Sequence, residues 1–88
     1  MWYFYILQSL KDKNYFYKGS TNNLGRRLLQ HNSGEVDSTR PMIPFRFIYY
    51  EAYLSEKDAR HREHNLKLKS KAFAQLKKRL EHTFKLTF

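Results

Sequence analysis

The sequence predicts a small α/β (α+β) domain whose strands and helices follow the order ββαβαα. Three short runs rich in aromatic and β-branched residues, at 2–8, 15–19 and 45–53, are typical of strands. Three other stretches carry apolar residues at helical spacing, one before the third strand and two after it. The chain has 88 residues, which is enough for one domain at most, so we expect a single domain over 1–88.

The composition excludes several classes of protein. There is no cysteine, so neither a disulfide nor a thiolate metal site braces the fold, as is usual in a reducing compartment. No apolar run reaches the ~20 residues that a membrane span needs. The first ten residues, MWYFYILQSL, have neither the basic start nor the small-residue cleavage site of a signal peptide. We therefore expect a cytoplasmic protein without a membrane partner.

The charge indicates a polyanionic partner. Seventeen Lys and Arg residues oppose eight Asp and Glu residues, which gives a net charge of +9. Nucleic acid is the commonest reason for such an excess in a small protein. The alternatives are solubility, or a structural role within a larger basic assembly. Net charge does not locate a site, so the choice among them depends on particular residues.

The first two strands predict a hairpin. The polar segment SLKDKN separates WYFYILQ from YFYKG, and the second strand is expected to end at Gly19. If the turn is centred on Lys11, Tyr5 and Tyr17 lie directly opposite each other on one face of the sheet. A slip of one residue would move one tyrosine to the other face.

The first helix is predicted to begin near Thr21 or Asn22, both of which are good N-caps, and to end at Gly34. Its apolar stripe is marked by two leucines, Leu24 and Leu28.

Three polar residues of this helix differ in direction. Arg27 and His31, at positions i and i+4, flank the apolar stripe and should line the edge of whatever the helix packs on. Arg26 points almost directly away from the stripe. We therefore expect Arg26 to be a solvated cation and Arg27 to belong to a packed site.

The segment 35–44, EVDSTRPMIP, lacks periodicity and holds both prolines, which predicts a loop. Thr39 and Arg40 are candidate phosphate contacts within it. The alternative is a plain exposed loop.

The second helix should follow Ser55 as its cap and run to about Lys69. Ala59, Leu66 and Glu63 share one narrow face of it, and Glu63 is the only acid there. A carboxylate on an apolar face requires a partner, because burial without one costs several kcal/mol or forces protonation. A structural salt bridge, for instance with Arg27, is one explanation; a metal ligand or an acid–base group is the other.

A third helix is predicted over 70–81, with its lysines and Arg79 facing solvent. The tail HTFKLTF alternates Phe84, Leu86 and Phe88, which favours an edge strand or a segment lying across the domain. Such an edge would allow two chains to pair, so we expect a monomer or a weak dimer. The four histidines do not form a convincing metal set.

Several motifs along the chain carry a resemblance to a known family. The strand YFYIL holds the tripeptide at 3–5, and YKG follows at 17–19. Arg27 and His31 come ten and fourteen residues after the tyrosine of YKG. The segments STRPMIP, FRFIYYEAY and SEKDARHREHNLK also match, with Glu63 at the acidic position. This ordered set resembles the GIY-YIG nuclease superfamily, and specifically its small stand-alone bacterial (UPF0213-like) single-domain members.

The resemblance implies a fold and a chemistry. The fold is a three-stranded antiparallel β-sheet flanked by helices. The chemistry is the hydrolysis of DNA phosphodiester bonds with one divalent metal, Mg²⁺ or Mn²⁺, and no small-molecule cofactor. In-line attack on phosphate requires an activated water and groups that stabilise the developing negative charge.

The resemblance also implies catalytic roles for five residues. Glu63 would hold the metal, and Arg27 would clamp the scissile phosphate with its planar fork. Tyr5 and Tyr17 would position or deprotonate the attacking water, with His31 hydrogen-bonded to a tyrosine. A free tyrosine titrates near 10, so a general-base role requires nearby cations, Arg27 and the metal, to lower its pKa.

Contacts with the DNA backbone, without sequence specificity, are expected from six residues. Gly19 is expected to allow a tight backbone turn where the phosphate approaches. The six are Lys18, Gly19, Arg26, Thr39, Arg40 and Lys67.

The chain departs from the family pattern in three places. The first tripeptide keeps only its tyrosine, and Lys18 stands where an apolar residue is usual. Many members also carry an asparagine after the acidic helix, where this chain reads KAFAQLKK and offers only Gln75. Lys18 should face away from Tyr17, either snorkelling to solvent or facing DNA. The sequence therefore predicts an endonuclease, with branched, nicked or damaged DNA as candidate substrates; the alternative is a nucleic-acid-binding module that cleaves little or nothing.

Overall fold

The computed structural model describes residues 1–86 of the chain. Three antiparallel strands form one sheet with β1 at its centre, in the order β2-β1-β3. The strands are β1 (Trp2–Ser9), β2 (Phe16–Thr21) and β3 (Phe45–Tyr53). The helices are α1 (Leu24–Asn32), the short 3-10 helix η1 (Arg40–Met42), α2 (Glu56–Leu68), α3 (Ser70–Arg79) and α4 (Glu81–Leu86). The predicted antiparallel sheet and element order are confirmed, with α4 as an addition.

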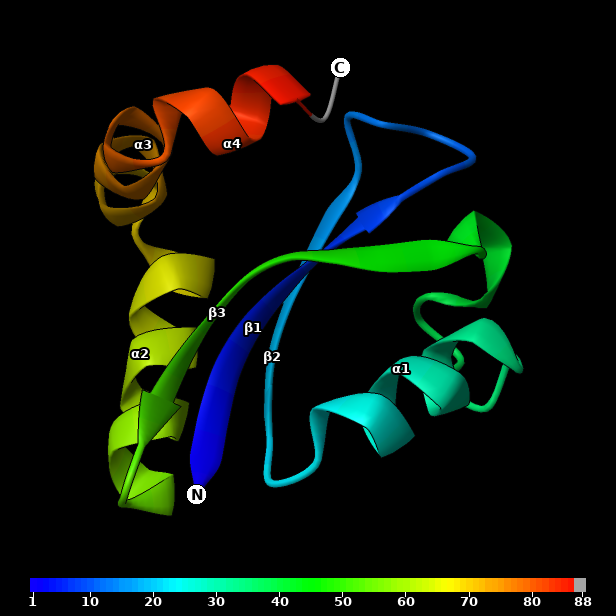
Figure 1. Ribbon diagram of the computed structural model, residues 1–88, viewed down its shortest axis with the longest axis horizontal. Helices are drawn as coiled ribbons and strands as arrows, with labels where there is room; N and C mark the ends of the chain where they lie inside the picture. Colours follow the sequence, from blue (N-terminus) through cyan, green and yellow to red (C-terminus); the bar gives the residue numbers. More distant parts are fainter. Residues whose placement is uncertain (87–88) are drawn as a thin grey trace.

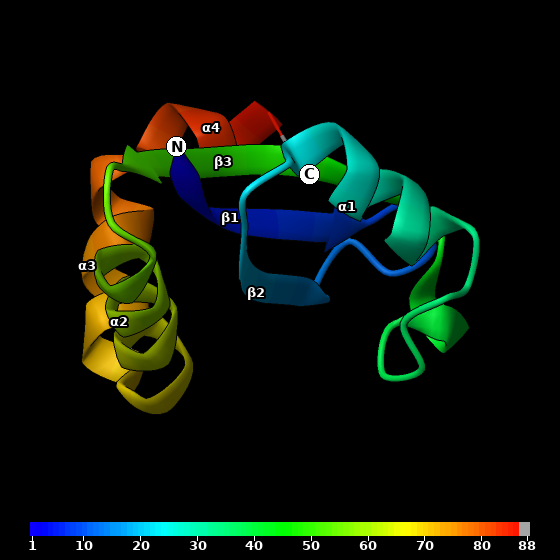
Figure 2. The ribbon, with the colours of Figure 1, turned by 90° about the horizontal axis from the view of Figure 1, so that it is seen from below.

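Helices pack on both sides of the sheet. In both views α2 and α3 lie to one side of the strands and α1 lies to the other (Figure 1 and Figure 2). The side chains of successive β1 residues point alternately to the two faces of the sheet. Phe4 and Ile6 pack with Leu66 of α2 and form one core cluster, whereas Tyr5 and Leu7 belong to a second cluster beside α1. The central strand is therefore buried on both faces.

The hairpin register differs from the prediction by two residues. Tyr5 pairs with Gly19, and Tyr17 pairs with Leu7. The two tyrosines are therefore diagonal neighbours, with ring centroids 6.2 Å apart, and their predicted direct opposition is wrong. A shift of two residues leaves each side chain on its own face, so the expectation that both tyrosines share a face is confirmed.

Helix α1 begins one residue later than expected. Thr21 is the last residue of β2, and Asn23 is the N-cap, whose Oδ1 accepts a hydrogen bond from the Arg26 amide at 3.0 Å. The helix stops as predicted at Gly34, which has a φ of 80°. This left-handed conformation favours glycine.

Strand β3 changes face in its middle because of a β-bulge. The pairing with β1 shifts between Ile6 and Leu7, which leaves Ile48 as the extra residue. Phe47 packs beside α1, whereas Tyr49 and Tyr53 pack on the α2 side. One strand therefore contributes aromatic rings to both cores.

The tail is helical where the structure describes it. Helix α3 ends at Arg79 and α4 follows, so the predicted edge strand is wrong within residues 82–86. Phe84 is placed four residues after Leu80, and its ring lies 5.5 Å from that of Phe16. Helical spacing thus places the half-buried Phe84 ring against Phe16. The predicted contribution of Phe88 lies outside the described residues.

Among residues 1–86, no helix is both long enough and apolar enough to cross a membrane.

Candidate active site

The aromatic centre of the site is formed by residues from three elements. Tyr5 of β1 and Tyr17 of β2 both face α1, which contributes His31. The Tyr5 hydroxyl lies 3.1 Å from His31 Nε2, and the Tyr17 and His31 rings are 4.8 Å apart. The structure therefore brings together three residues that the sequence singled out, and the predicted hydrogen bond between His31 and a tyrosine is present.

A buried chain of hydrogen bonds passes through Tyr5 and His31. Arg27 Nε donates to the Tyr5 hydroxyl at 3.3 Å. On the far side, His31 Nδ1 lies 2.8 Å from Thr39 Oγ1, and the Thr39 hydroxyl donates to the Val36 carbonyl at 3.3 Å. We assign the proton to Nδ1, because every donor then has one acceptor: Tyr5 donates to Nε2, Nδ1–H donates to Thr39, and Thr39 donates to Val36.

Both titratable groups of this chain are neutral near pH 7. Burial raises the pKa of Tyr5 to about 12, and the hydrogen bond from Arg27 only partly opposes this. Burial, followed by the positive charge of Arg27, lowers the pKa of His31 to about 4. Arg27 lowers the pKa of Tyr5, as expected, but desolvation is the larger effect, so Arg27 alone does not bring this pKa below its ordinary value.

Arg27 remains charged between the two tyrosines. Burial disfavours its charge, but hydrogen bonds to Tyr5 and Tyr17 outweigh that effect and raise its pKa. The guanidinium also donates to the Gln30 side chain at 3.1 Å. Arg27 is thus held in one orientation, as the sequence predicted for a residue of a packed site.

Gly19 provides the space for the Tyr5 ring. It lies inside β2 and opposite Tyr5, so the prediction of a tight turn at this glycine is wrong. A Cβ atom at position 19 would lie 2.5 Å from the Tyr5 hydroxyl oxygen and 2.6 Å from Cζ. Any other residue would displace the tyrosine.

Glu63 reaches the sheet at its β2 edge. Its Oε1 accepts a hydrogen bond from Ser20 Oγ at 2.6 Å, and its Oε2 lies 2.7 Å from Lys67 Nζ. The partner suggested from the sequence, Arg27, is wrong; Lys67, one helical turn away on α2, is the ion-pair partner. The carboxylate also contributes, as the smallest cause, to the raised pKa of Tyr5, so the two groups belong to one electrostatic site.

Helix α2 is also held on its other side. Arg62 donates to both Glu51 oxygens of β3, at 2.9 and 3.1 Å, and the Tyr49 and Tyr53 hydroxyls donate to the same carboxylate at 2.6 Å. Burial opposes ionisation of Glu51, but these hydrogen bonds outweigh it and keep its pKa below the ordinary value. This cluster fixes α2 against β3 and so positions Glu63.

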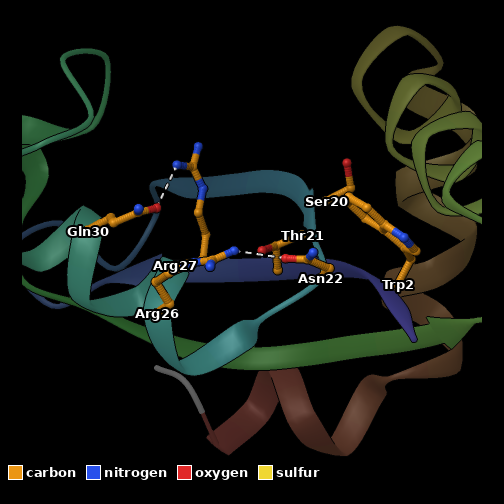
Figure 3. Close-up of a pocket in the computed structure, with 7 residues that line it drawn as sticks. All are labelled: Trp2, Ser20, Thr21, Asn22, Arg26, Arg27 and Gln30. Carbon is orange, nitrogen blue, oxygen red and sulfur yellow. Dashed lines mark hydrogen bonds between the residues drawn. The ribbon is translucent and has the colours of Figure 1, made fainter.

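A polar pocket of about 370 Å³ lies beside Arg27 (Figure 3). Two arginine–amide pairs line it: Arg26 donates to Asn22 Oδ1 at 2.8 Å, and Arg27 donates to Gln30 Oε1. Because the amide oxygens accept from the arginines, the groups that face a ligand are predominantly N–H donors. Such a pocket suits an anion. Its lining residues are Trp2, Ser20, Thr21, Asn22, Arg26, Arg27 and Gln30.

Comparison with known proteins agrees with this geometry. Residues 1–80 match the family model described as the GIY-YIG catalytic domain. The chain belongs to the GIY-YIG family. The resemblance predicted from the motifs is confirmed, and so is the fold. The chain therefore carries the catalytic domain of a nuclease family.

The relatives of this GIY-YIG chain are small proteins from several organisms. A UPF0213 protein of Bacillus pumilus is 35% identical over 66 residues, which are 74% of this chain and 65% of the relative, just under two thirds of its length. A UPF0213 protein of Clostridium perfringens is 38% identical over 66 residues, 74% of this chain and 69% of the relative. A UPF0213 protein of Lactiplantibacillus plantarum is 35% identical over 88 residues and covers 97% of this chain and 84% of the relative.

The donor set of the GIY-YIG site suits a hard divalent cation that keeps most of its water. Nucleases of this family are generally dependent on a divalent metal. In residues 1–86 no cluster of three or more His, Cys, Asp or Glu side chains could hold a metal ion. Glu63 is a single carboxylate that is 23% exposed and already has a positive charge beside it. Mg²⁺ is typically bound by one or two carboxylates plus water and phosphate oxygens, so the residues fit.

Two of the predicted DNA contacts are instead engaged in hydrogen bonds within the protein. Thr39 is fully buried and bonded to His31, so its predicted phosphate contact is wrong. Arg40 is exposed, but its Nε donates to the Gly34 carbonyl at 2.9 Å and its guanidinium pairs with Asp37. Arg40 thus stabilises the C-terminal end of α1.

Lys18 occupies the α2–α3 side of the sheet, as its alternation with Tyr17 predicted. Its Nζ lies 3.8 Å from the centre of the Phe73 ring. Burial, and then the positive charges of Lys77 and Lys67, lower its pKa. Lys67 is closer to the site, with Nζ 5.2 Å from the Tyr17 ring centre.

Sequence reasoning missed Ser20 and the structural role of Thr39. Ser20 directly follows the YKG motif, and alternation along the strand would have placed it with Lys18 on the side of α2. Thr39 carries no comparable signal, because a loop without periodicity does not reveal which residue turns inward.

Proposed function

We propose that the chain is a metal-dependent DNA endonuclease whose centre lies at the β2 edge, where Glu63, Arg27 and Tyr17 converge beside the donor-lined pocket. This convergence of a partly exposed carboxylate with a fixed cation carries the proposal. The GIY-YIG membership supports it. We expect Mg²⁺ or Mn²⁺ as the cation and a role in DNA repair or in processing branched or nicked DNA.

A divalent cation bound at Glu63 would activate water and offset the negative charge of the phosphate. The protein's own groups do the rest. Arg27, already oriented by Tyr5 and Gln30, binds the scissile phosphate through its free N–H groups. Arg26 and the amide groups of Asn22 bind the neighbouring phosphate in the pocket. We expect these contacts to be independent of sequence, since they reach only the backbone.

The two tyrosines have different tasks in this proposal. Tyr5 is fully buried and neutral and is hydrogen-bonded on both sides, so it orients Arg27 and His31. Tyr17 is only partly buried and lies next to Lys67 at the rim. We assign to Tyr17 the placement of the attacking water.

The test is incubation of the protein with supercoiled, branched and single-stranded DNA in Mg²⁺ or Mn²⁺. We expect nicking by the native chain and its loss in Glu63→Gln and Arg27→Ala, each checked for native folding by circular dichroism. Normal cleavage by a well-folded Glu63→Gln variant would contradict the assigned role of Glu63.

Absence of nicking in every condition would favour the alternative, a DNA-binding module with the same fold. The raised pKa of Tyr5 is the observation in its favour, because it removes one candidate base. Such a module, binding through ~5 phosphates, should lose roughly 500-fold in affinity between 50 and 200 mM salt.

A further inference from the structure

The cation-binding oxygen of Glu63 already has an ammonium group beside it. Lys67 Nζ lies 2.7 Å from Oε2, while Ser20 occupies the other oxygen. The same Nζ lies 5.2 Å from the centre of the Tyr17 ring. Lys67 therefore places its positive charge between the carboxylate and the tyrosine, in the region where a divalent cation would bind.

The surroundings of Lys67 make this pairing exchangeable. Its side chain is 41% exposed, so the long stem can turn towards solvent at little cost. Lys67 also lies near a like charge, because the positive charges of Lys77 and Lys67 both act on Lys18. If Glu63 is taken by another cation, Lys67 is left near like charges and requires a new anionic partner. A DNA phosphate at the β2 edge is such a partner.

We propose that Lys67 competes with the divalent cation for Glu63, and that DNA relieves this competition by drawing the Lys67 ammonium group onto a backbone phosphate. DNA and the cation then bind cooperatively, each raising the affinity for the other by the same factor. The inference rests on the proposed function in one respect, the assignment of Glu63 as the cation ligand. Lys67 acts through Glu63 and is a positioning residue.

The expected change in cation affinity follows from the type of ion pair that Lys67 and Glu63 form. Exposed ion pairs at i and i+4 contribute little to stability. Removing the Lys67 ammonium group breaks its pair with Glu63 and ends its repulsion of the incoming cation. Together these two changes should raise the affinity for the cation about threefold to tenfold. In the native chain, DNA should raise cation affinity by a similar factor. Without Lys67 this effect of DNA should largely disappear.

The experiment measures Mn²⁺ binding by electron paramagnetic resonance, with and without a short DNA duplex. Lys67→Met removes the charge but keeps an apolar stem. Lys77→Met is the matched control, because it removes the same charge from the same lysine group without a contact to Glu63. The Glu63→Gln variant lacks the proposed Mn²⁺ ligand, so the Mn²⁺ that it still binds is the background bound by the DNA or elsewhere on the protein. Gel electrophoresis afterwards checks that the DNA is intact, and circular dichroism checks folding.

We expect Lys67→Met to bind Mn²⁺ at least about threefold more tightly than Lys77→Met without DNA, and to lose most of the DNA effect. Equal affinities in the two variants would overturn the inference, as would an undiminished DNA effect or no Mn²⁺ binding by Lys67→Met. Failure of the proposed function has a different signature: the native chain binds Mn²⁺ through Glu63 and nicks no DNA.

Discussion

The two halves of the site differ in burial and in charge. Around Tyr5, the hydrogen bonds that run from Tyr5 through His31 to Thr39 are closed to water, and the tyrosine and the histidine are neutral. At the β2 edge, Glu63 and Lys67 are partly exposed, charged and paired with each other. In the buried half, the hydrogen bonds have one arrangement in which each donor has an acceptor. At the β2 edge, Glu63 can exchange the Lys67 ammonium group for another cation. Substitutions in the buried half should therefore affect stability, and substitutions at the edge should affect binding and cleavage.

Acidification should produce the largest effect on stability through His31. Burial lowers the pKa of this histidine to about 4 in the folded protein, from an ordinary value of 6.5 that applies to the unfolded chain. Between these values the unfolded chain binds more protons, so stability is complete above about pH 6.5 and falls as the pH drops towards 4, by about 3 kcal/mol.

Urea unfolding at pH 7.0 and pH 4.5 measures this loss, and His31→Gln should show much less of it. An equal pH dependence in the native and variant chains would rule out the buried neutral histidine.

The substitution Gly19→Ala should have the next largest effect on stability. The added Cβ would overlap the Tyr5 ring, which is buried and hydrogen-bonded on both sides. Overpacking of this kind costs about 1–3 kcal/mol. Urea unfolding gives the value. Gly25→Ala is the control, since its Cβ would have only an ordinary contact with Asn23. Similar stabilities of the two variants would show that Tyr5 is loosely held.

Thr39→Val should cost about 1–2 kcal/mol. It keeps the shape of the side chain but removes the hydroxyl that accepts from His31 Nδ1, leaving a buried donor without its partner. Ser38→Ala, at the exposed neighbouring position, should stay within about 0.5 kcal/mol of the native chain. Thermal unfolding of both variants checks the difference, which should vanish if Thr39 faces solvent.

Glu63→Gln should change stability least. The amide still accepts from Ser20, and the lost ion pair with Lys67 is worth at most about 1 kcal/mol at this exposure. Its unfolding curve should nearly overlay that of the native chain, while Mn²⁺ binding is lost. A strongly destabilised variant would place Glu63 in the structural half of the site.

Much of the site follows from local patterns in the sequence. Helical spacing placed Arg27 and His31 beside the packed edge and Arg26 outside it. The face shared by Glu63, Ala59 and Leu66 singled out Glu63, whose carboxylate reaches Ser20 at the β2 edge. These predictions succeeded because a helix has a fixed angle per residue.

Longer-range features were less predictable. The hairpin register depends on the geometry of a loop that carries no recognisable turn signature, so Tyr5 faced Gly19 instead of Tyr17. The bulge at Ile48 exchanges the two faces of β3, and nothing in FRFIYYEAY marks where it occurs. The tail shows how a period-two pattern is ambiguous, because a helix that follows Leu80 also brings Phe84 against the domain, beside Phe16.

The two contacts made by consecutive residues of α2 have a consequence for the precision of the site. Arg62 attaches the helix to β3 and Glu63 attaches it to β2, which are opposite edges of the sheet. Rotation of α2 about its axis in either direction would lengthen one of these contacts. The helix therefore has a single rotational setting, and the accuracy with which Glu63 is aimed depends on Glu51, a glutamate at the far edge of the sheet.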